Sequence, residues 1–332
     1  DFLRKELFIM QKQQITIADV MQAYKRIRGV VKKTPLIRCE KLEELFHGAE
    51  VYLKLENLQY TGSFKVRGVA NKMLSLSKEE LSRGVTAASS GNHAQAVSYM
   101  ADKLGVHATI VMPENAPATK VAGARGYGAE VVLCGFTGEN RDRKCEELIQ
   151  KYGYCLVHSH MDPYVITGHG TTAYEAWEQM GGAMTDLILP CGAGSLTSGA
   201  AFAMHQLDPS VHVVAVEPAA VPRFTESIKA GKPVTVEMGQ TIADGLRVSK
   251  AEQINYELIR DNVDQLLTIG EAPIRQAVKE MALRAKVCAE PSACVGIAAV
   301  GGQIDTSRGK KLCFVISGGN LDAALLSQIL TE

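Results

Sequence analysis

Short runs of apolar residues alternate with longer amphipathic segments along the whole chain. The runs are rich in Val, Ile and Leu, and Gly, Pro, Asn or Ser stands at their ends. Such continuous hydrophobicity is typical of strands that are buried on both faces of a parallel sheet. The pattern predicts strands at Val51–Leu55, Val85–Ala88, Ala108–Met112, Glu130–Leu133, Asp186–Leu189, Val211–Val216 and Leu312–Ile316.

The segments between these strands carry apolar positions at helical spacing. We predict helices at Asn92–Leu104, Thr171–Met180 and Ala272–Ala289. A further helix is expected after Thr16, because a threonine N-cap followed by an acidic residue, here Asp19, satisfies the free N–H groups of a first turn. Strand and helix alternate from end to end, which predicts an α/β fold with largely parallel sheets.

The composition limits the classes of partner. The 332 residues are 46% hydrophobic, which is enough for a large core. Lys plus Arg and Asp plus Glu both number 36, and neither sign forms a run, so binding to nucleic acid or to a membrane surface has no electrostatic support. No apolar run approaches the length of a membrane span, and segment 1–14, in which Met10 is a candidate start, lacks the apolar centre of a signal peptide. The expected partner is a small molecule.

The cysteines indicate the compartment. None of the eight forms a C-x-x-C pair, and several stand in strand-like apolar runs. Buried free thiols in a reducing cytosol are the simplest interpretation, which predicts a cytoplasmic protein. The eight are Cys39, Cys134, Cys145, Cys155, Cys191, Cys288, Cys294 and Cys313.

The segment Thr61–Gly68, with the sequence TGSFKVRG, follows the first predicted strand. Lys65 is a candidate for attack on an aldehyde cofactor, because apolar packing or the charge of Arg67 would lower the pKa of its amine. Phe64 would then pack beside a flat ring. The alternative is a solvated lysine at a helix start, which is the more frequent case for a lysine taken alone.

The segment Ser89–Gln95, with the sequence SSGNHAQ, ends a predicted strand and opens a helix. Free N–H groups at a helix N-terminus attract anions, so this turn is a candidate seat for a carboxylate. Asn92 offers a side-chain donor to a phenolate-type oxygen. An ordinary helix cap and a structural His93 are the alternative interpretation.

Glycine-rich turns end two other predicted strands. Pro190–Ala200 (PCGAGSLTSGA) leads into a helix and presents successive N–H groups to a phosphate, although it is neither a P-loop nor a dinucleotide fingerprint. Ser317–Asn320 (SGGN) places a serine hydroxyl at the end of the last strand. Each of these sequences also fits a plain tight turn.

Together and in this order, the four motifs resemble those of the tryptophan-synthase-β-like (fold type II) enzymes that use pyridoxal 5′-phosphate (PLP). The resemblance is greatest to the branch of threonine dehydratases, serine racemases and hydroxyaspartate dehydratases, and it covers nearly the whole chain. Further matching stretches are Thr34–Leu36, Leu53–Asn57, Val165–Thr171, Ala243–Gly245 and Glu290–Ser292. The resemblance implies two open, twisted, mostly parallel sheets covered by helices. It places PLP in the cleft between a large domain, 1–82 and 154–332, and a small mobile domain, 83–153.

The resemblance also assigns roles to the matching residues. The implied cofactor-binding residues are Lys65 as Schiff base, Phe64 against the pyridine ring, Asn92 at the ring 3′-oxygen, Gly192, Ala193, Gly194 and Ser195 at the phosphate, and Ser317 facing the pyridine nitrogen. The implied substrate-binding residues are Ser89, Ser90, Gly91, Asn92, His93 and His160. A neutral serine opposite the ring nitrogen suits rapid β-elimination, because it does not hold that nitrogen protonated.

The implied reaction converts a small β-hydroxy amino acid of the serine, threonine or hydroxyaspartate class to a 2-oxo acid and ammonia, with Lys65 as the general base. Ser90 keeps racemisation open, because serine racemases have serine here and its hydroxyl would protonate Cα on the face opposite Lys65. A serine that only caps the helix is the alternative. A weakly catalytic PLP-binding sensor is a third hypothesis. The resemblance also implies a homodimer.

Two departures from the family motifs lie in the phosphate loop and in the cation site. Ala193 and Ser195 stand where two of four consecutive glycines are usual, which predicts an altered phosphate loop. Many members bind a divalent cation through a residue that matches Glu217 and a downstream aspartate. Arg223 stands at that downstream position, so we expect a salt bridge to Glu217 in place of the ion.

A third departure concerns the wall of the site. His160 and His169 stand where an aromatic residue and a glutamine are usual, which favours a substrate more polar than threonine. His158, His160 and Asp162 alternate, so an alternative is a metal site on one face of a strand, although the spacing is not a standard zinc pattern.

Overall fold

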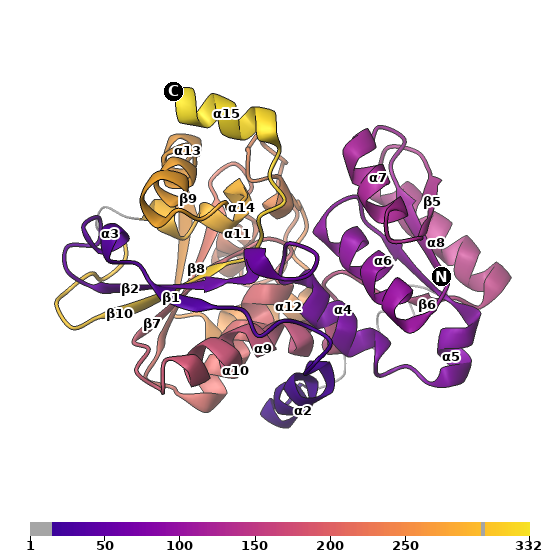
Figure 1. Ribbon diagram of the computed structural model, residues 1–332, viewed down its shortest axis with the longest axis horizontal. Helices are drawn as coiled ribbons and strands as arrows, with labels where there is room; N and C mark the ends of the chain where they lie inside the picture. Colours follow the sequence, from indigo (N-terminus) through magenta and orange to yellow (C-terminus); the bar gives the residue numbers. More distant parts are fainter. Residues whose placement is uncertain (1–14, 300–302) are drawn as a thin grey trace. The chain divides into compact units, whose positions relative to one another are not determined.

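A computed structural model describes residues 15–299 and 303–332, which form two compact units. The first unit contains Lys65–Gly168 and the described residues up to Val31, and the second contains Lys32–Phe64 and His169–Glu332. Segment 1–14, with Met10, lies outside the described residues. The predicted small domain, 83–153, falls inside the first unit, and its boundaries stay a prediction. Figure 1 shows that each unit is built around one sheet.

The sheet of the first unit has the strand order β5-β4-β3-β6, and all its pairs are parallel. Its strands are β3 (Val85–Ala88), β4 (Ala108–Met112), β5 (Glu130–Leu133) and β6 (Cys155–Leu156). Its helices are α2 (Ile17–Ile27), α4 (Lys65–Met73), α5 (Lys78–Arg83), α6 (Asn92–Leu104), α7 (Ala118–Arg125) and α8 (Gly138–Tyr152), and α9 (Pro163–Gln179) begins here.

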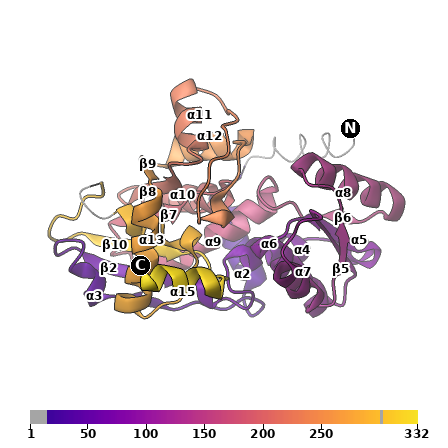
Figure 2. The same ribbon diagram turned by 90° about the horizontal axis from the view of Figure 1, so that it is seen from above.

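Successive side chains of β4 are buried on opposite faces of this sheet. Ile110 and Met112 pack in the cluster formed with α4 and α6, whereas Val111 packs against Cys145 and Leu148 of α8. Side chains of a strand point alternately to opposite faces, so α8 covers one face and the other two helices cover the other (Figure 2). This arrangement explains why the strand sequences are apolar without interruption.

The sheet of the second unit has the strand order β1-β2-β10-β7-β8-β9, in which only β1 is antiparallel to its neighbour. Its strands are β1 (Leu36–Arg38), β2 (Glu50–Leu55), β7 (Asp186–Pro190), β8 (His212–Pro218), β9 (Gln265–Ile269) and β10 (Lys311–Ile316). Its helices are α3 (Glu40–Glu43), α10 (Ser195–Leu207), α11 (Arg223–Ala230), α12 (Gln253–Asn262), α13 (Glu271–Glu280), α14 (Pro291–Cys294) and α15 (Ala323–Thr331), with the later part of α9.

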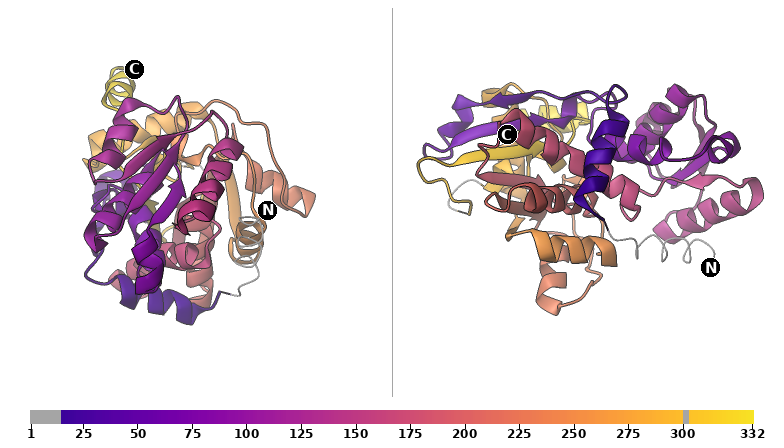
Figure 3. Two further views of the ribbon diagram at one scale, coloured as in Figure 1. Left: turned by 90° about the vertical axis from the view of Figure 1, so that its right-hand side faces the viewer. Right: turned by 90° about the horizontal axis from the view of Figure 1, so that it is seen from below.

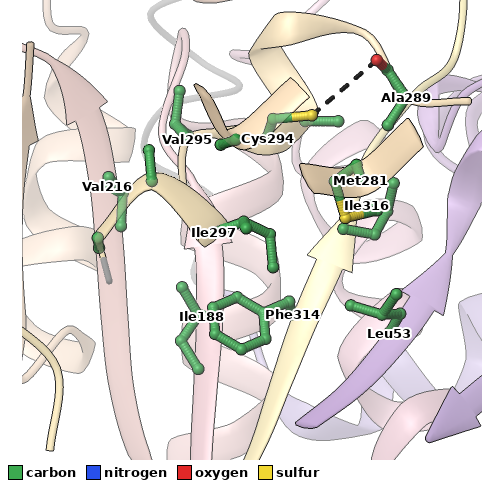
Figure 4. Close-up of a cluster of buried hydrophobic side chains, with 14 of the residues drawn as sticks. Leu53, Ile188, Val216, Met281, Ala289, Cys294, Val295, Ile297, Phe314 and Ile316 are labelled. Atoms are coloured by element: carbon green, nitrogen blue, oxygen red, sulfur yellow. Dashed lines mark hydrogen bonds between the residues drawn. The ribbon is translucent and has the colours of Figure 1, made fainter. Parts of the chain in front are cut away.

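Strand β10 divides the core of the second unit into two layers. Leu312, Phe314 and Ile316 face the cluster that includes α13 and α14, while Cys313 and Val315 face α9 and α10. Figure 4 shows Phe314 among Leu53, Ile188 and Ile297. Helices thus cover both faces of the sheet, as the views in Figure 3 also show.

Local signals in the sequence account for several element boundaries. The helix N-cap predicted at Thr16 is confirmed, and it forms a capping box: the Thr16 side chain accepts a hydrogen bond from the N–H of Asp19, whose carboxylate accepts one from the N–H of Thr16. The helix predicted over Ala272–Ala289 is wrong at its end. Helix α13 passes at Met281 into a π-helical turn, and Lys286, at a φ of 57°, stops it.

Two further observations concern the cysteines and possible membrane-spanning helices. All eight cysteines are free, but Cys288 is exposed, so the expectation of burial is wrong there. None of the helices in the described ranges is long and apolar enough to cross a membrane.

Candidate active site

Lys65 is the first residue of α4 and lies partly buried in the first unit. Its Nζ donates a hydrogen bond to the backbone carbonyl of Ser159, at 3.1 Å. Burial lowers the pKa of the Lys65 amine from 10.5 to about 8, because the loss of water destabilises the charged ammonium more than the neutral amine. Of the two causes that the sequence suggested, apolar packing and the charge of Arg67, burial is the one that lowers this pKa. A substantial fraction of this amine is therefore neutral near physiological pH.

The turn Ser89–His93 joins the end of β3 to the start of α6. Ser89 Oγ accepts a hydrogen bond from the N–H of Gly91, at 3.3 Å. Helix α6 begins at Asn92, and the dipole at this N-terminus favours an anion. Ser90 caps no N–H group, and its half-buried side chain makes no hydrogen bond with the described residues. This disfavours the interpretation of Ser90 as a plain helix cap.

His93 is almost completely buried and bonds to backbone rather than to solvent. Its Nε2 lies 2.8 Å from the carbonyl oxygen of Val157, so Nε2 carries the proton and donates. Burial, and then the charge of Lys65, lower the pKa of His93 to about 3. The ring is therefore neutral, and its Nδ1 has no hydrogen-bond partner within the described ranges.

The segment 158–161, which follows β6, forms a tight turn beside Lys65. Nδ1 of His158 accepts hydrogen bonds from the backbone N–H groups of His160, at 3.3 Å, and Met161, at 3.0 Å. The rings of His158 and His160 meet edge to face with centroids 4.6 Å apart. Nδ1 of His160 lies 2.8 Å from Ser159 Oγ. From the sequence, His160 was predicted at the substrate and His158 was considered only for the alternative metal site, because the turn that orients His158 is not visible in the sequence.

The alternative metal site of His158, His160 and Asp162 is not formed. The segment lies outside any strand, and Asp162 pairs with Lys72 at 2.8 Å and accepts a hydrogen bond from the N–H of Tyr164. Within residues 15–299 and 303–332, no group of three or more His, Cys, Asp or Glu side chains is placed to hold a metal ion.

In the second unit, the loop between β7 and α10 forms a backbone cradle. Gly194, at a φ of 99°, takes the left-handed conformation that glycine tolerates, whereas Ala193 has a negative φ. A Cβ on Gly194 would lie only 2.8 Å from Cζ of Phe224. The helix then begins at Ser195 and offers its first N–H groups to an anion. The loop thus accommodates Ala193 because the left-handed conformation is required at the next residue, Gly194.

Two residues that depart from the family motifs contact each other. Nδ1 of His169 lies 3.1 Å from Ser195 Oγ, and both side chains are buried. The other face of the His169 ring meets Phe64 edge to face, with centroids 4.6 Å apart. The histidine therefore links the residue that precedes Lys65 to the first residue of α10.

Ser317 lies at the end of β10, next to Phe64 in space. Its backbone carbonyl accepts a hydrogen bond from the N–H of Phe64, at 3.0 Å, and Ser63 pairs with Gly318 as an isolated antiparallel bridge. Ser317 itself is 4% exposed. The structure thus brings Ser317 beside Phe64, the residue that precedes Lys65 in the sequence.

Arg223 is buried and bonded to backbone, not to Glu217. Its guanidinium donates to the carbonyl oxygens of Cys191 at 3.3 Å, Leu246 at 3.2 Å and Val248 at 2.8 Å. The predicted salt bridge is therefore wrong. A planar guanidinium carries five N–H donors, so one side chain can donate to three converging carbonyl groups at once.

Glu217 is held by the first turn of α11 instead. Its carboxylate accepts hydrogen bonds from the backbone N–H groups of Phe224, at 3.2 Å, and Thr225, at 2.8 Å. Burial raises the pKa of Glu217, and these N–H groups together with the charge of Arg223 oppose that rise. The carboxylate thus caps a helix N-terminus.

The residues present fit the cofactor that the motifs imply. A partly buried amine with a lowered pKa is suited to binding an aldehyde. The N-terminus of α10 is suited to binding a phosphate, and close packing against Phe224 and Asn255 leaves no room for a Cβ on Gly194, the residue before it.

Comparison with known proteins points to one family. A family profile described as "Pyridoxal-phosphate dependent enzyme" matches residues 27–318. The chain is 39% identical over 318 residues to the L-threonine ammonia-lyase of Thermotoga maritima, covering 96% of this chain and 79% of that protein. It is 40% identical over 307 residues to the L-threo-3-hydroxyaspartate ammonia-lyase of Saccharomyces cerevisiae, covering 92% and 94%. The crystal structure of serine racemase from Dictyostelium discoideum matches with a TM-score of 0.87 and 37% identity, covering 93% of this chain and 99% of that one.

Proposed function

Because the chain belongs to the pyridoxal-phosphate dependent enzyme family, we propose that it is an ammonia-lyase that dehydrates and deaminates a small β-hydroxy amino acid. The products are a 2-oxo acid and ammonia, and the substrate class is serine, threonine or hydroxyaspartate. The observation that carries this proposal is Lys65: its pKa is lowered to about 8 by burial. One amine can therefore bind an aldehyde and later accept a proton.

When bound, PLP stabilises the negative charge that develops at Cα of an amino acid. The residues proposed to hold it are Lys65 covalently, Phe64 beside the ring, Asn92 at the ring oxygen, Gly192, Ala193, Gly194 and Ser195 at the phosphate, and Ser317 at the ring nitrogen. Ser195 is buried and bonded to His169, so its hydroxyl is fixed in orientation at the start of α10.

The chain's own residues supply binding and proton transfer. The N-terminal turn of α6, with Ser89, Gly91 and Asn92, binds the substrate carboxylate through N–H groups and the helix dipole. Lys65 removes the Cα proton, and the carbonyl of Ser159 at 3.1 Å orients its Nζ. His93 stays neutral and supports the turn through its bond to Val157.

A second candidate activity is racemisation, and the geometry at Ser90 favours it. The hydroxyl of Ser90 is not used as a helix cap and makes no hydrogen bond with the residues described. Such a hydroxyl is available to protonate Cα on the face opposite Lys65. One of the solved structures that this chain resembles is a serine racemase, which also supports racemisation as a candidate activity.

A substrate panel tests both activities. The holoenzyme is incubated with L-serine, L-threonine and L-threo-3-hydroxyaspartate, the 2-oxo acid is assayed, and the remaining amino acid is analysed on a chiral column. We expect 2-oxo acid from at least one substrate. Ser90→Ala should lower racemisation by about 100-fold or more, the usual contribution of a general acid, and change elimination only a few-fold. Racemisation that survives in Ser90→Ala would exclude this role, and a protein that binds substrate without turnover would be a sensor.

The rate of covalent cofactor attachment should depend on pH. Only the neutral amine of Lys65 attacks the aldehyde, so the rate for the apoprotein mixed with PLP should increase with pH and level off above about 8. Stopped-flow absorbance over pH 6–11 measures it. A midpoint near 10.5, the ordinary value for lysine, would contradict the effect of burial.

The homodimer and the cytoplasmic location remain predictions of this proposal. Sedimentation of the holoenzyme would test the first.

A further inference from the structure

The turn 158–161 holds the imidazole of His158 in a single tautomer. Nδ1 accepts hydrogen bonds from two backbone N–H groups, those of His160 and Met161. A ring nitrogen that accepts hydrogen bonds carries no proton, so in the neutral ring the proton resides on Nε2. The backbone of this turn thus fixes His158 as an Nε2–H donor.

This donor stays neutral over the physiological pH range. Burial, and then the positive charge of Lys65, lower the pKa of His158 to about 4. The ring is only partly buried, and beyond those two bonds it makes no hydrogen bond with the described part of the chain. The Nε2–H group is therefore available to a ligand.

The donor lies beside the residue that reacts. The charge of Lys65 lowers the pKa values of both His158 and His93, and Lys65 Nζ bonds to the carbonyl of Ser159, the residue after His158. In the proposed function, Lys65 accepts the proton of the substrate Cα. The substrate side chain begins at that same carbon, so His158 stands next to the place where the side chains of candidate substrates differ.

The chemistry of the donor discriminates among those side chains. The methyl group of threonine cannot accept a hydrogen bond, and serine has no group at that position. The second carboxylate of hydroxyaspartate accepts an N–H···O⁻ bond, which is stronger than a neutral one. A site built to donate a hydrogen bond also disfavours an analogue that leaves its donor unpaired.

We propose that His158 is a specificity-determining residue that donates from Nε2 to the distal carboxylate of a β-hydroxy dicarboxylic amino acid. This inference rests on the proposed function and names the substrate class within it. The neighbouring ring of His160, bonded to Ser159 Oγ, supports His158 edge to face.

Steady-state kinetics of the holoenzyme with L-threo-3-hydroxyaspartate and L-threonine test the inference. The wild type should have the higher kcat/KM for hydroxyaspartate. His158→Phe, which keeps a ring but no donor, should lower the ratio of the two kcat/KM values roughly 10- to 100-fold, the range for one charged hydrogen bond. His158→Gln, which keeps a donor, should stay within about fivefold of the wild type. His107→Phe is the matched control, since that half-exposed histidine stands before β4, at the end of the sheet opposite to Ser89.

A binding measurement separates recognition from catalysis. Succinate carries two carboxylates but no amine, and its binding to the holoenzyme is followed by the visible absorbance of the cofactor. His158→Phe should weaken succinate binding about tenfold or more and leave acetate binding unchanged. In long-range 1H–15N spectra, the pKa of His158 should increase when succinate binds, because a nearby anion stabilises the charged ring.

The outcomes distinguish this inference from the proposed function. A wild type that prefers threonine, or a His158→Phe variant with an unchanged ratio and unchanged succinate binding, would overturn the role of His158 and leave the lyase in place. A protein that produces 2-oxo acid from none of the substrates would overturn the proposed function itself. Circular dichroism and cofactor content confirm that each variant is folded.

Discussion

Replacement of Lys65 by alanine is expected to abolish the covalent attachment of PLP and to lower 2-oxo acid formation by roughly four orders of magnitude. The amine at this position supplies both the cofactor bond and the general base, and the base alone contributes up to about 10⁴-fold. Absorbance spectra of the purified variant, and mass spectrometry after borohydride reduction, measure the loss of attachment. In the wild type, reduction should label the peptide that contains Lys65.

Lys78→Ala is the matched control for this experiment. Lys78 begins α5 in the same unit, and its side chain is exposed. Its removal should leave the absorbance band and the labelled peptide unchanged. If the Lys65→Ala protein kept the band, another amine would hold the cofactor, and the role given to Lys65 would be wrong.

Replacement of Arg223 by alanine is expected to destabilise the protein by about 3–5 kcal/mol and to weaken PLP binding. The change removes the guanidinium donor from the carbonyl groups of Cys191 and Val248 and one of the two donors to the carbonyl group of Leu246, which keeps the N–H of Val248. It also removes a positive charge that acts on the buried Glu217. Cys191 directly precedes the loop proposed to hold the phosphate. We therefore expect the loss of the hydrogen bond to its carbonyl group to disturb that loop and weaken PLP binding. Urea unfolding and PLP titration of the apoprotein measure the two effects.

Arg260→Ala is the control, since Arg260 is an exposed arginine of the same unit that pairs with Asp261. Its loss should change the free energy of unfolding by less than about 1 kcal/mol. Because the Arg223 guanidinium already bonds to these carbonyl groups, neither EDTA nor Mg²⁺ should shift the melting temperature of the wild type. A shift of several degrees with Mg²⁺ would mean that a cation binds here after all.

The family and the α/β class were predictable from the sequence. Four strand-end motifs matched one family in order, and the family profile and the racemase structure confirm both predictions. Strands β3, β4 and β5 were placed within their observed bounds, as was helix α6. These elements have continuous apolar runs or clear helical periodicity, so local pattern alone identifies them.

The strands that sequence reasoning missed are β1, β6 and β9, which all lie at sheet edges. An edge strand has one paired side and is less buried, so its sequence lacks the continuous apolar run of a central strand. The residues Leu36–Arg38 of β1 and Gln265–Ile269 of β9 are largely half-buried or exposed. Their assignment depends on a neighbour far away in the sequence.

Side-chain partners were the least predictable part of the site. Arg223 and Glu217 were expected to pair, yet each bonds to backbone groups that only the folded loops bring near. His158 was considered only for a metal site for the same reason, since two N–H groups of its own turn fix its tautomer. A sequence identifies which chemical groups are present, whereas tertiary structure decides which group each one bonds to.

The place of β10 in its sheet has a consequence for synthesis of the protein. This strand lies between β2 and β7 but comes after both of them in the chain, so a ribosome must synthesise residues 311–316 before the larger sheet can close. Until then, the apolar edges of β2 and β7 are open to wrong pairing. The smaller sheet is encoded within residues 85–156 and can form much earlier during translation. We expect the nascent chain to need chaperone protection mainly in this interval.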